Sequence, residues 1–172
     1  MSLSLYDISI PVFIRGLNNL SAVLKKAEKY ADEKGIPHSK LLEARLAPDM
    51  AALPFQIQTC SNTSKGAAVR VGGVEPTSMD DNESTFEELQ TRIRKTIEIL
   101  QGVDRKVFEG KEEKEVIFRA GGAEYKFTGK SFMLDYALPN FFFHDTAAYA
   151  ILRHMGVPLG KLDYMGFKDG KV

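Results

Sequence analysis

The sequence of 172 residues is 44% hydrophobic and 27% charged, a mixture typical of a single globular domain spanning residues 1–172. Its 23 Lys and Arg residues balance its 23 Asp and Glu residues, and it has neither a basic cluster nor an apolar run of about 18 residues, which argues against a nucleic-acid partner and a membrane span. Cys60 is the only cysteine, so an internal disulfide and a cysteine-rich zinc site are excluded and a cytoplasmic location is favoured.

The first predicted element is a long amphipathic helix that ends at Gly35 and Pro37. Pro11 lies near its start, where it either kinks the first turns or marks where the helix begins. Apolar and small residues recur at three- and four-residue spacing, which places them on one face of this helix: Leu5, Ile8, Val12, Gly16, Val23, Ala27 and Tyr30.

A short helix over residues 39–46 and a second long helix over residues 48–71 are predicted next. Pro48 suits the first turn of the second long helix, and Gly72 with the glycine after it would end the helix. Pro54 should bend this helix, because proline has no N–H to donate to the preceding turn.

A polar loop over residues 75–82 leads into a third long helix over residues 85–101. Ser84 and Glu87 form a predicted capping box, in which each side chain bonds the backbone N–H of the other residue. The apolar residues that follow recur at helical spacing, which supports an amphipathic helix here.

A β-hairpin is predicted over residues 115–128, because two runs rich in β-forming residues flank a glycine pair. The most apolar stretch, residues 130–155, predicts a fourth long helix that Pro139 should kink or break. Residues 167–172 are expected to form a flexible tail. The predicted fold is therefore mainly α: a four-helix bundle with a small hairpin between the third and fourth helices.

Three polar side chains lie four residues apart along one side of the fourth helix: Tyr136, Asn140 and His144. A helix that is apolar nearly all round is expected to be central, so these side chains should be shielded from water. Asp49 and Gln56 share a stripe of the predicted second helix. Because a lone buried carboxylate is costly, pairing of Asp49 with Arg45 or, across the helices, with His144 is expected.

Each of these residues also has a plainer interpretation. His144 could be a hydrogen-bonded core histidine, and Asn140 could cap the backbone at the kink. Asp49 could simply be an acid favoured by the positive end of a helix. Asn19 on the first helix could join the same pocket, and Cys60 is interpreted as a small core residue.

Several motifs resemble those of an uncharacterised domain-of-unknown-function family, in the same order along nearly the whole chain. They are LEARLAPDM at 42–50, KGA at 65–67, ALPNFFFH at 137–144, ILRH at 151–154 and LGK at 159–161. That family in turn resembles the DinB/YfiT-like superfamily. The resemblance implies a four-helix bundle that is often a dimer.

The resemblance also implies a place for the site. Many members of that superfamily bind a divalent metal through three histidines, one from the second helix and two from the last, and some are thiol-dependent transferases. His144 matches the second histidine of the last helix, Asn140 stands at the place of the first, and Asp49 or Gln56 stands at the second-helix position. One imidazole, one carboxylate and one amide would bind zinc or nickel poorly.

Three functional hypotheses are compatible with these residues. The first is a pocket between the second and fourth helices that binds a small apolar or aromatic molecule and needs no cofactor, with Asp49 and His144 as general base and acid. The second is a divalent-metal-dependent transferase or hydrolase that uses His144 and Asp49 as ligands. The third is a non-enzymatic interaction module, with a homodimer as the expected assembly. The substrate-binding residues of the first hypothesis are Asn140, Tyr136, Gln56 and Asn19.

Overall fold

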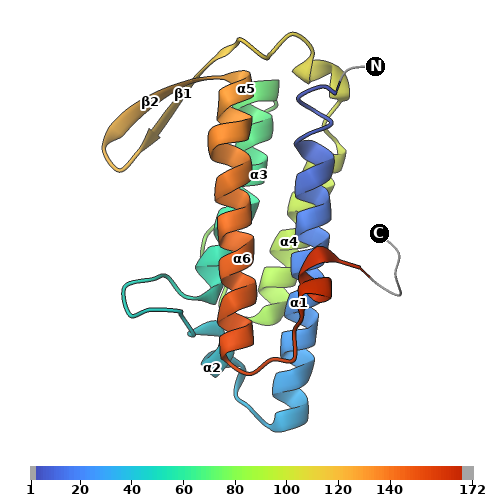
Figure 1. Ribbon diagram of the computed structural model, residues 1–172, viewed down its shortest axis with the longest axis vertical. Helices are drawn as coiled ribbons and strands as arrows, with labels where there is room; N and C mark the ends of the chain where they lie inside the picture. The colour runs from blue at the N-terminus through green and yellow to red at the C-terminus, as the bar shows by residue number, and fades with distance from the viewer. Residues whose placement is uncertain (1–2, 168–172) are drawn as a thin grey trace.

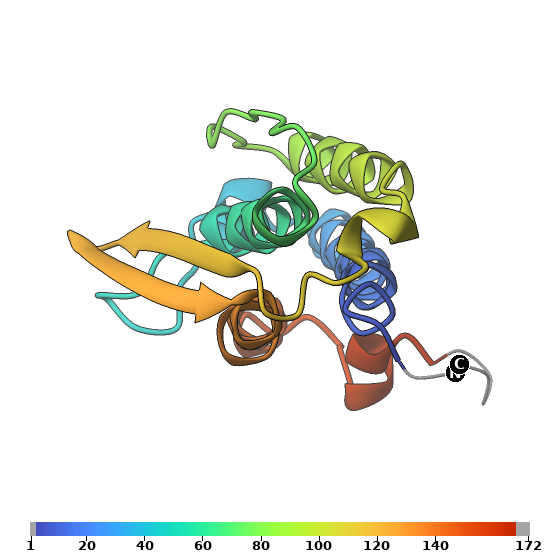
Figure 2. The same ribbon diagram turned by 90° about the horizontal axis from the view of Figure 1, so that it is seen from above.

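The computed structural model describes residues 3–167, which form a bundle of helices with a small β-hairpin at one end (Figure 1). Four long helices lie side by side, as the view from above also shows (Figure 2): α1 (Ile10–Lys34), α3 (Leu53–Ala67), α4 (Phe86–Gln101) and α6 (Leu138–His154). The shorter helical segments are α2 (His38–Leu42), η1 (Ala68–Gly72), η2 (Arg105–Phe108), α5 (Gly129–Ser131), η3 (Phe132–Ala137) and α7 (Lys161–Met165).

The predicted mainly α fold with a hairpin before the last long helix is confirmed. Within residues 3–167, none of the helices combines the length and the hydrophobicity that crossing a bilayer requires. The predicted flexible tail falls, apart from Phe167, outside the described residues.

The ends of α1 follow the proline and glycine signals of the sequence. Pro11 lies in the first turn, so it marks the beginning of the helix and does not kink it. Gly35 closes the helix in the left-handed conformation, with φ of 63°, and the N–H of Ile36 donates to the carbonyl of Ala31 at 2.9 Å.

The predicted end of the short helix and the predicted start of the second long helix are wrong. Helix α2 stops at Leu42 and not at residue 46, because the carbonyl of Ala44 accepts the N–H of Leu53 at 3.1 Å and so turns the chain toward α3. Helix α3 begins at Leu53 and not at Pro48. Pro54 therefore stands in its first turn, where a missing N–H costs nothing, and does not bend it.

The N-terminus of α4 is capped one residue later than predicted. Thr85 is the N-cap, and its hydroxyl accepts the N–H of Glu88 at 3.2 Å. One carboxylate oxygen of Glu88 in return accepts the N–H groups of Ser84 and Thr85, at 2.8 and 3.0 Å. The predicted pair of Ser84 with Glu87 is thus wrong by one position, because Glu88 collects both orphan donors.

The hairpin has the predicted turn. Strands β1 (Glu115–Ala120) and β2 (Ala123–Thr128) pair antiparallel, with Ala120 opposite Ala123. Gly121 and Gly122 have φ of 57° and 78°, the left-handed values that a two-residue type I′ turn needs at both central positions.

The last long helix stays helical through Pro139. Segments α5, η3 and α6 follow one another without a break from Gly129 to His154. The π-helical η3 precedes the proline, and the N–H of Leu138 reaches back five residues to the carbonyl of Met133. The predicted kink or break at Pro139 is replaced by a wider turn, a known way for a helix to accommodate a disrupted hydrogen-bond ladder.

Helices α1 and α6 approach each other closely through a glycine. The rings of Phe13 and Phe141 lie 5.1 Å apart, centroid to centroid, and both side chains are fully buried. A Cβ at Gly16 would lie only 2.5 Å from Cε1 of Phe141. The close packing of this part of the core therefore depends on the missing side chain of Gly16.

Candidate functional site

A hollow of about 400 Å³ lies between two continuous helical rods, one made of α3 and η1 and the other of η3 and α6. This volume falls within the size range of ligand pockets, roughly 300–1,000 Å³. Strand β1 contributes Phe118 to its wall, and the loop over residues 74–84, which we call the strap, contributes Asp81. We call this space the α3–α6 hollow, and the lining residues that matter most below are Phe55, Thr63, Arg70, Phe118, Tyr136 and Asn140.

Two of the predicted substrate-binding residues line this hollow. Tyr136 is half-buried in a cluster of aromatic rings, at 4.3 Å from Phe118 and 5.3 Å from Phe132 between ring centroids. Burial raises the pKa of the Tyr136 hydroxyl. Asn140, one turn further along, donates from Nδ2 to Oγ1 of Thr63 on α3 at 2.8 Å.

His144 lies one turn beyond Asn140 and is oriented by Gln56. The Nδ1 atom of His144 is 2.7 Å from Oε1 of Gln56, and Nε2 of the same amide donates to the carbonyl of Ala51 at 2.9 Å. Because Oε1 can only accept, Nδ1 carries the proton and Nε2 of the imidazole keeps its lone pair. Gln56 is buried, so this arrangement is sheltered from water.

The environment of His144 favours the neutral imidazole. Burial lowers the pKa of His144 from its ordinary value of 6.5. The ring of Phe55, which also lines the hollow, packs edge-on against the imidazole at 5.8 Å between centroids. His144 is therefore a neutral base next to the hollow, separated from it by one aromatic side chain.

Among the described residues, neither Asp49 nor Asn19 lines the hollow or forms a hydrogen bond with His144. Asp49 is exposed on the turn before α3, and within residues 3–167 no hydrogen bond joins it to His144 or to Arg45. We expected Asp49 as a possible partner of His144, and the residue that bonds His144 is Gln56. Asn19 donates to the carbonyl of Tyr164 at 3.2 Å and so holds α7 against α1, away from the hollow.

The described residues do not fit a divalent metal well. No group of three or more His, Cys, Asp and Glu side chains able to hold an ion occurs in residues 3–167. Asn140, at the place of the first histidine of the last helix, is bonded to Thr63, and its amide is a weak ligand. Of the predicted ligands only His144 resembles a metal ligand, because its Nδ1–H is held by a second residue and its Nε2 keeps a lone pair.

The sequence did not point to Arg70, Phe118 or Asp145. Arg70 follows Gly66 by one helical turn, a spacing too common to serve as a signal. Phe118 reaches the hollow only because the hairpin packs against η3, which no local pattern predicts. Asp145 is an acid within the most apolar helix, and this is the one signal that could have singled it out.

Asp145 is a buried carboxylate, with only 4% of the residue exposed. Burial raises its pKa from 3.8 to about 7, an effect that the nearby Tyr164 hydroxyl partly opposes. Cys60 on α3 is also fully buried, and burial together with the charge of Asp145 raises the pKa of its thiol well above the ordinary value. The thiol is thus unreactive, as expected for a core cysteine.

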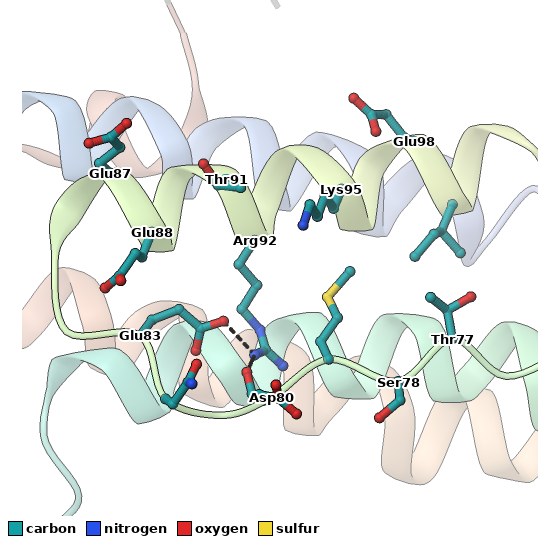
Figure 3. Close-up of a pocket in the computed structure, with 13 residues that line it drawn as sticks. Thr77, Ser78, Asp80, Glu83, Glu87, Glu88, Thr91, Arg92, Lys95 and Glu98 are labelled. Carbon is teal, nitrogen blue, oxygen red and sulfur yellow. Dashed lines mark hydrogen bonds and ion pairs between the residues drawn. The ribbon is translucent and has the colours of Figure 1, made fainter.

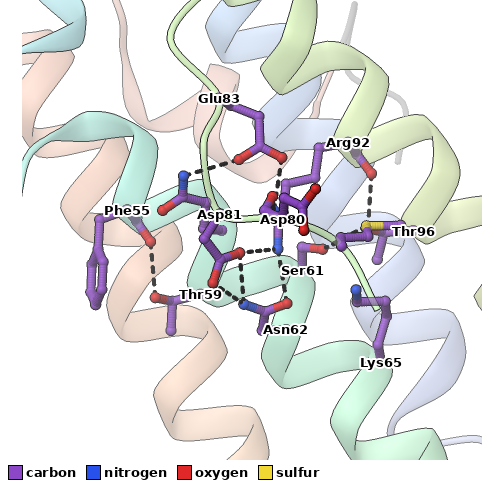
Figure 4. A network of polar contacts seen from close by, with 12 residues as sticks. Phe55, Thr59, Ser61, Asn62, Lys65, Asp80, Asp81, Glu83, Arg92 and Thr96 are labelled. Carbon is purple, nitrogen blue, oxygen red and sulfur yellow. Dashed lines mark hydrogen bonds and ion pairs between the residues drawn. The ribbon is translucent and has the colours of Figure 1, made fainter. Parts of the chain in front are cut away.

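The strap is tied to α3 and α4 by Arg92. The guanidinium is almost fully buried and bonds Glu83 and Asp81 on the strap, each at 2.7 Å, and Oδ1 of Asn62 on α3 at 2.8 Å (Figure 4). Its Nη1 also donates to the carbonyl of Asp80 at 2.8 Å. This network holds Asp81 at the rim of the α3–α6 hollow.

A larger and more open groove, of about 910 Å³, lies on the other side of the strap along α4 (Figure 3). Its walls are rich in carboxylates, and two of these already have structural roles. Glu88 caps α4, where hydrogen bonds lower its pKa, and Glu83 pairs with Arg92 and accepts from Gln58. We therefore place the candidate site in the smaller hollow, where polar groups and aromatic rings converge.

Comparison with known proteins agrees with the fold. Residues 5–165 match the family DUF1993, described as a domain of unknown function. The chain is also similar to the crystal structure of a DinB family member protein from Shewanella denitrificans, with 36% sequence identity, a TM-score of 0.88 and coverage of 98% of this chain and 95% of that one. None of the curated proteins compared matches the chain. The resemblance inferred from the motifs is confirmed.

Proposed function

The chain belongs to the DUF1993 family, and we propose that it binds a small molecule in the α3–α6 hollow and acts on it through His144. The observation that carries the proposal is the convergence of Tyr136 and Asn140 on one hollow whose wall, Phe55, also contacts the imidazole. Aromatic rings with a few fixed polar groups are the usual composition of ligand pockets. Phe118 and Phe132 beside Tyr136 favour a ligand with an apolar or aromatic body.

The proposed chemistry is acid–base catalysis without a cofactor. Gln56 fixes the imidazole so that Nε2 can take a proton, and burial keeps the ring neutral near neutral pH. Movement of Phe55, whose side chain is 48% exposed, would open the way between the hollow and Nε2. Asp49 is the proposed second acid–base group; it is exposed on the turn before α3 and would act if that turn moved toward the bound ligand.

Binding in the hollow is tested with phenol and indole as probes, followed by the backbone amide shifts of the full chain. Saturable shifts are expected at Thr63, Tyr136 and Asn140. Replacing Asn140 with leucine removes the bond to Thr63 and fills part of the space, so binding should weaken about tenfold, equivalent to roughly 1.4 kcal/mol. Asn18→Leu, on the exposed face of α1, is the matched control and should leave binding unchanged. Equal binding by both variants would contradict the proposal.

The role of His144 is tested by the titration of its ring nitrogens. The pKa should lie below 6.5, because burial disfavours the imidazolium, and the neutral ring should carry its proton on Nδ1. Gln56→Leu should let the proton redistribute between the two nitrogens without unfolding the chain. An imidazole that titrates above its ordinary pKa, or that keeps the same tautomer without Gln56, would remove His144 as the proposed base.

We also propose a homodimer formed through the hairpin, which projects away from the helices (Figure 1). Ile117 and Tyr125 on the hairpin are 42% and 48% exposed, and the outer edges of a two-stranded sheet offer unpaired backbone groups. Sedimentation equilibrium should give twice the monomer mass, and Tyr125→Lys should lower it. A single monomer mass for the unaltered chain would overturn this assembly.

The cytoplasm is the proposed location. The only cysteine, Cys60, is buried and has no second cysteine to pair with, so the chain gains nothing from an oxidising compartment. Recovery of the protein outside the cytoplasmic fraction of its host would contradict this location.

A further inference from the structure

Arg70 extends its guanidinium across the aromatic wall of the α3–α6 hollow. Its Cζ atom lies 5.2 Å from the ring centroid of Phe118 and 5.9 Å from that of Phe132. The space for this arrangement comes from Gly66, one turn earlier, because a Cβ there would overlap Nη1 of Arg70. The contacts with two rings and the space left at Gly66 thus favour one position for this exposed arginine.

The guanidinium of Arg70 has donors to spare. Within residues 3–167 it forms no ion pair and no side-chain hydrogen bond, whereas Arg92 nearby is bound by Glu83 and Asp81. Asp81, the one carboxylate among the described residues that line the hollow, is already engaged by Arg92 and by Nδ2 of Asn62. Among the described residues that line the hollow, Arg70 is therefore the only charged residue that has no ion-pair partner.

Two hydroxyl groups can join Arg70 as donors. Oγ1 of Thr63 accepts from Asn140, which leaves its own hydrogen available to a ligand. The Tyr136 hydroxyl forms no hydrogen bond with any described residue, and burial keeps it protonated by raising its pKa. Arg70 and Tyr136 both pack against the ring of Phe118, at 5.2 Å from Cζ and 4.3 Å between ring centroids, which places the two groups in one neighbourhood.

We propose that the molecule bound in the α3–α6 hollow is a small carboxylic acid with a flat apolar body, whose carboxylate is held by Arg70. This inference rests on the binding function proposed above and names the class of ligand. A guanidinium matches a carboxylate through two parallel hydrogen bonds, and the rings of Phe118 and Tyr136 receive the apolar body. A phosphate monoester, with a charge of about −1.5 to −2, would need a second cation that the hollow lacks and would face Asp81.

The test compares benzoate with its neutral analogue benzamide and with phenyl phosphate, again through the amide shifts of Thr63, Tyr136 and Asn140. Benzoate should bind the unaltered chain about tenfold more tightly than benzamide. Arg70→Met should abolish that preference and leave benzamide binding unchanged. Lys126→Met, which removes an exposed cation of β2 outside the hollow, is the matched control and should keep the preference.

A second variant moves the guanidinium without removing its charge. Gly66→Ala places a methyl group where Nη1 of Arg70 lies, and alanine favours the helix, so the chain should fold at least as well. It should lose the preference for benzoate nearly as completely as Arg70→Met does. If Gly66→Ala keeps the full preference, the place of the guanidinium does not depend on the space at Gly66, and that part of the inference is wrong.

The outcomes separate this inference from the function on which it rests. If benzoate and benzamide shift the same amides with equal affinity, the hollow binds aromatic molecules and the carboxylate inference is overturned. If phenyl phosphate binds most tightly, the ligand class is a phosphate and the inference is equally overturned. If no probe shifts these amides, the binding function itself is refuted. A benzoate preference that disappears with Arg70 supports both.

Discussion

Replacing Arg92 with methionine is expected to lower the free energy of unfolding by about 3 kcal/mol, measured by urea unfolding at neutral pH. The side chain of Arg92 is 1% exposed, and the side chains of its partners Glu83 and Asp81 are 11% and 51% exposed. Removing the guanidinium leaves the largely buried carboxylate of Glu83 without its cation. The loss stays near the lower end for a broken buried pair because Asp81 can turn to water.

The matched control is Lys95→Met, one turn further along α4. Lys95 also borders the groove beside the strap but is exposed and forms no ion pair with a described residue (Figure 3). Its replacement should change the stability by less than about 0.5 kcal/mol. Equal effects of the two substitutions would mean that the strap network does not stabilise the fold.

The double variant Arg92→Met with Glu83→Gln should recover part of the loss, because glutamine removes the unpaired charge that methionine leaves behind. The strap should also become more mobile in the single variant. Faster amide exchange at residues 74–84, with α1 unchanged, is the expected sign that the network anchors the strap to α3 and α4.

Replacing Asp145 with asparagine is expected to stabilise the protein above about pH 7 and to leave it unchanged below about pH 4. The folded state holds this carboxyl group at a pKa of about 7, against an ordinary value of 3.8. The difference corresponds to a gain on the order of 4 kcal/mol once the carboxylate would be fully charged. Asparagine has nearly the same shape as aspartic acid and carries no charge at any pH in this range.

The sign follows from which state binds the proton. Between about pH 4 and pH 7 the folded chain keeps the Asp145 proton and the unfolded chain releases it, so the contribution of Asp145 to stability falls as the pH rises through this window. The lowered pKa values of Asp7, Glu88 and Asp163 act below this window: their contributions are complete above about pH 4 and are lost as the pH falls further. The difference between Asp145→Asn and the unaltered chain isolates the contribution of Asp145.

Urea unfolding across this pH window measures that difference. It should be near zero at the acidic end and reach its full value above about pH 7. Asp135→Asn, at an exposed position of the same helical rod, should give no such trend. A difference that does not vary with pH would show that Asp145 is not held in its neutral form.

The sequence by itself determined the four long helices, the hairpin and the polar line along the last helix. These features depend on local chemistry: apolar spacing, a glycine that ends α1, and a glycine pair that takes a turn no other residue accepts easily. Where two local signals were equally good, the outcome needed longer-range information. We predicted that α3 begins at Pro48 and that Ser84 caps α4, whereas the structure places Pro54 in the first turn of α3 and uses Thr85 as the cap.

Only the tertiary structure decided which groups meet. Gln56 bonds His144 because α3 begins late and its amide is anchored on the carbonyl of Ala51. Arg70 faces the hollow because the hairpin, distant in sequence, brings Phe118 beneath it. Such contacts join surfaces whose packing depends on the whole chain, so no periodicity in the sequence encodes them. The helices could be predicted because the signals that form and end each one lie along its own sequence. The site could not, because it consists of contacts between different helices.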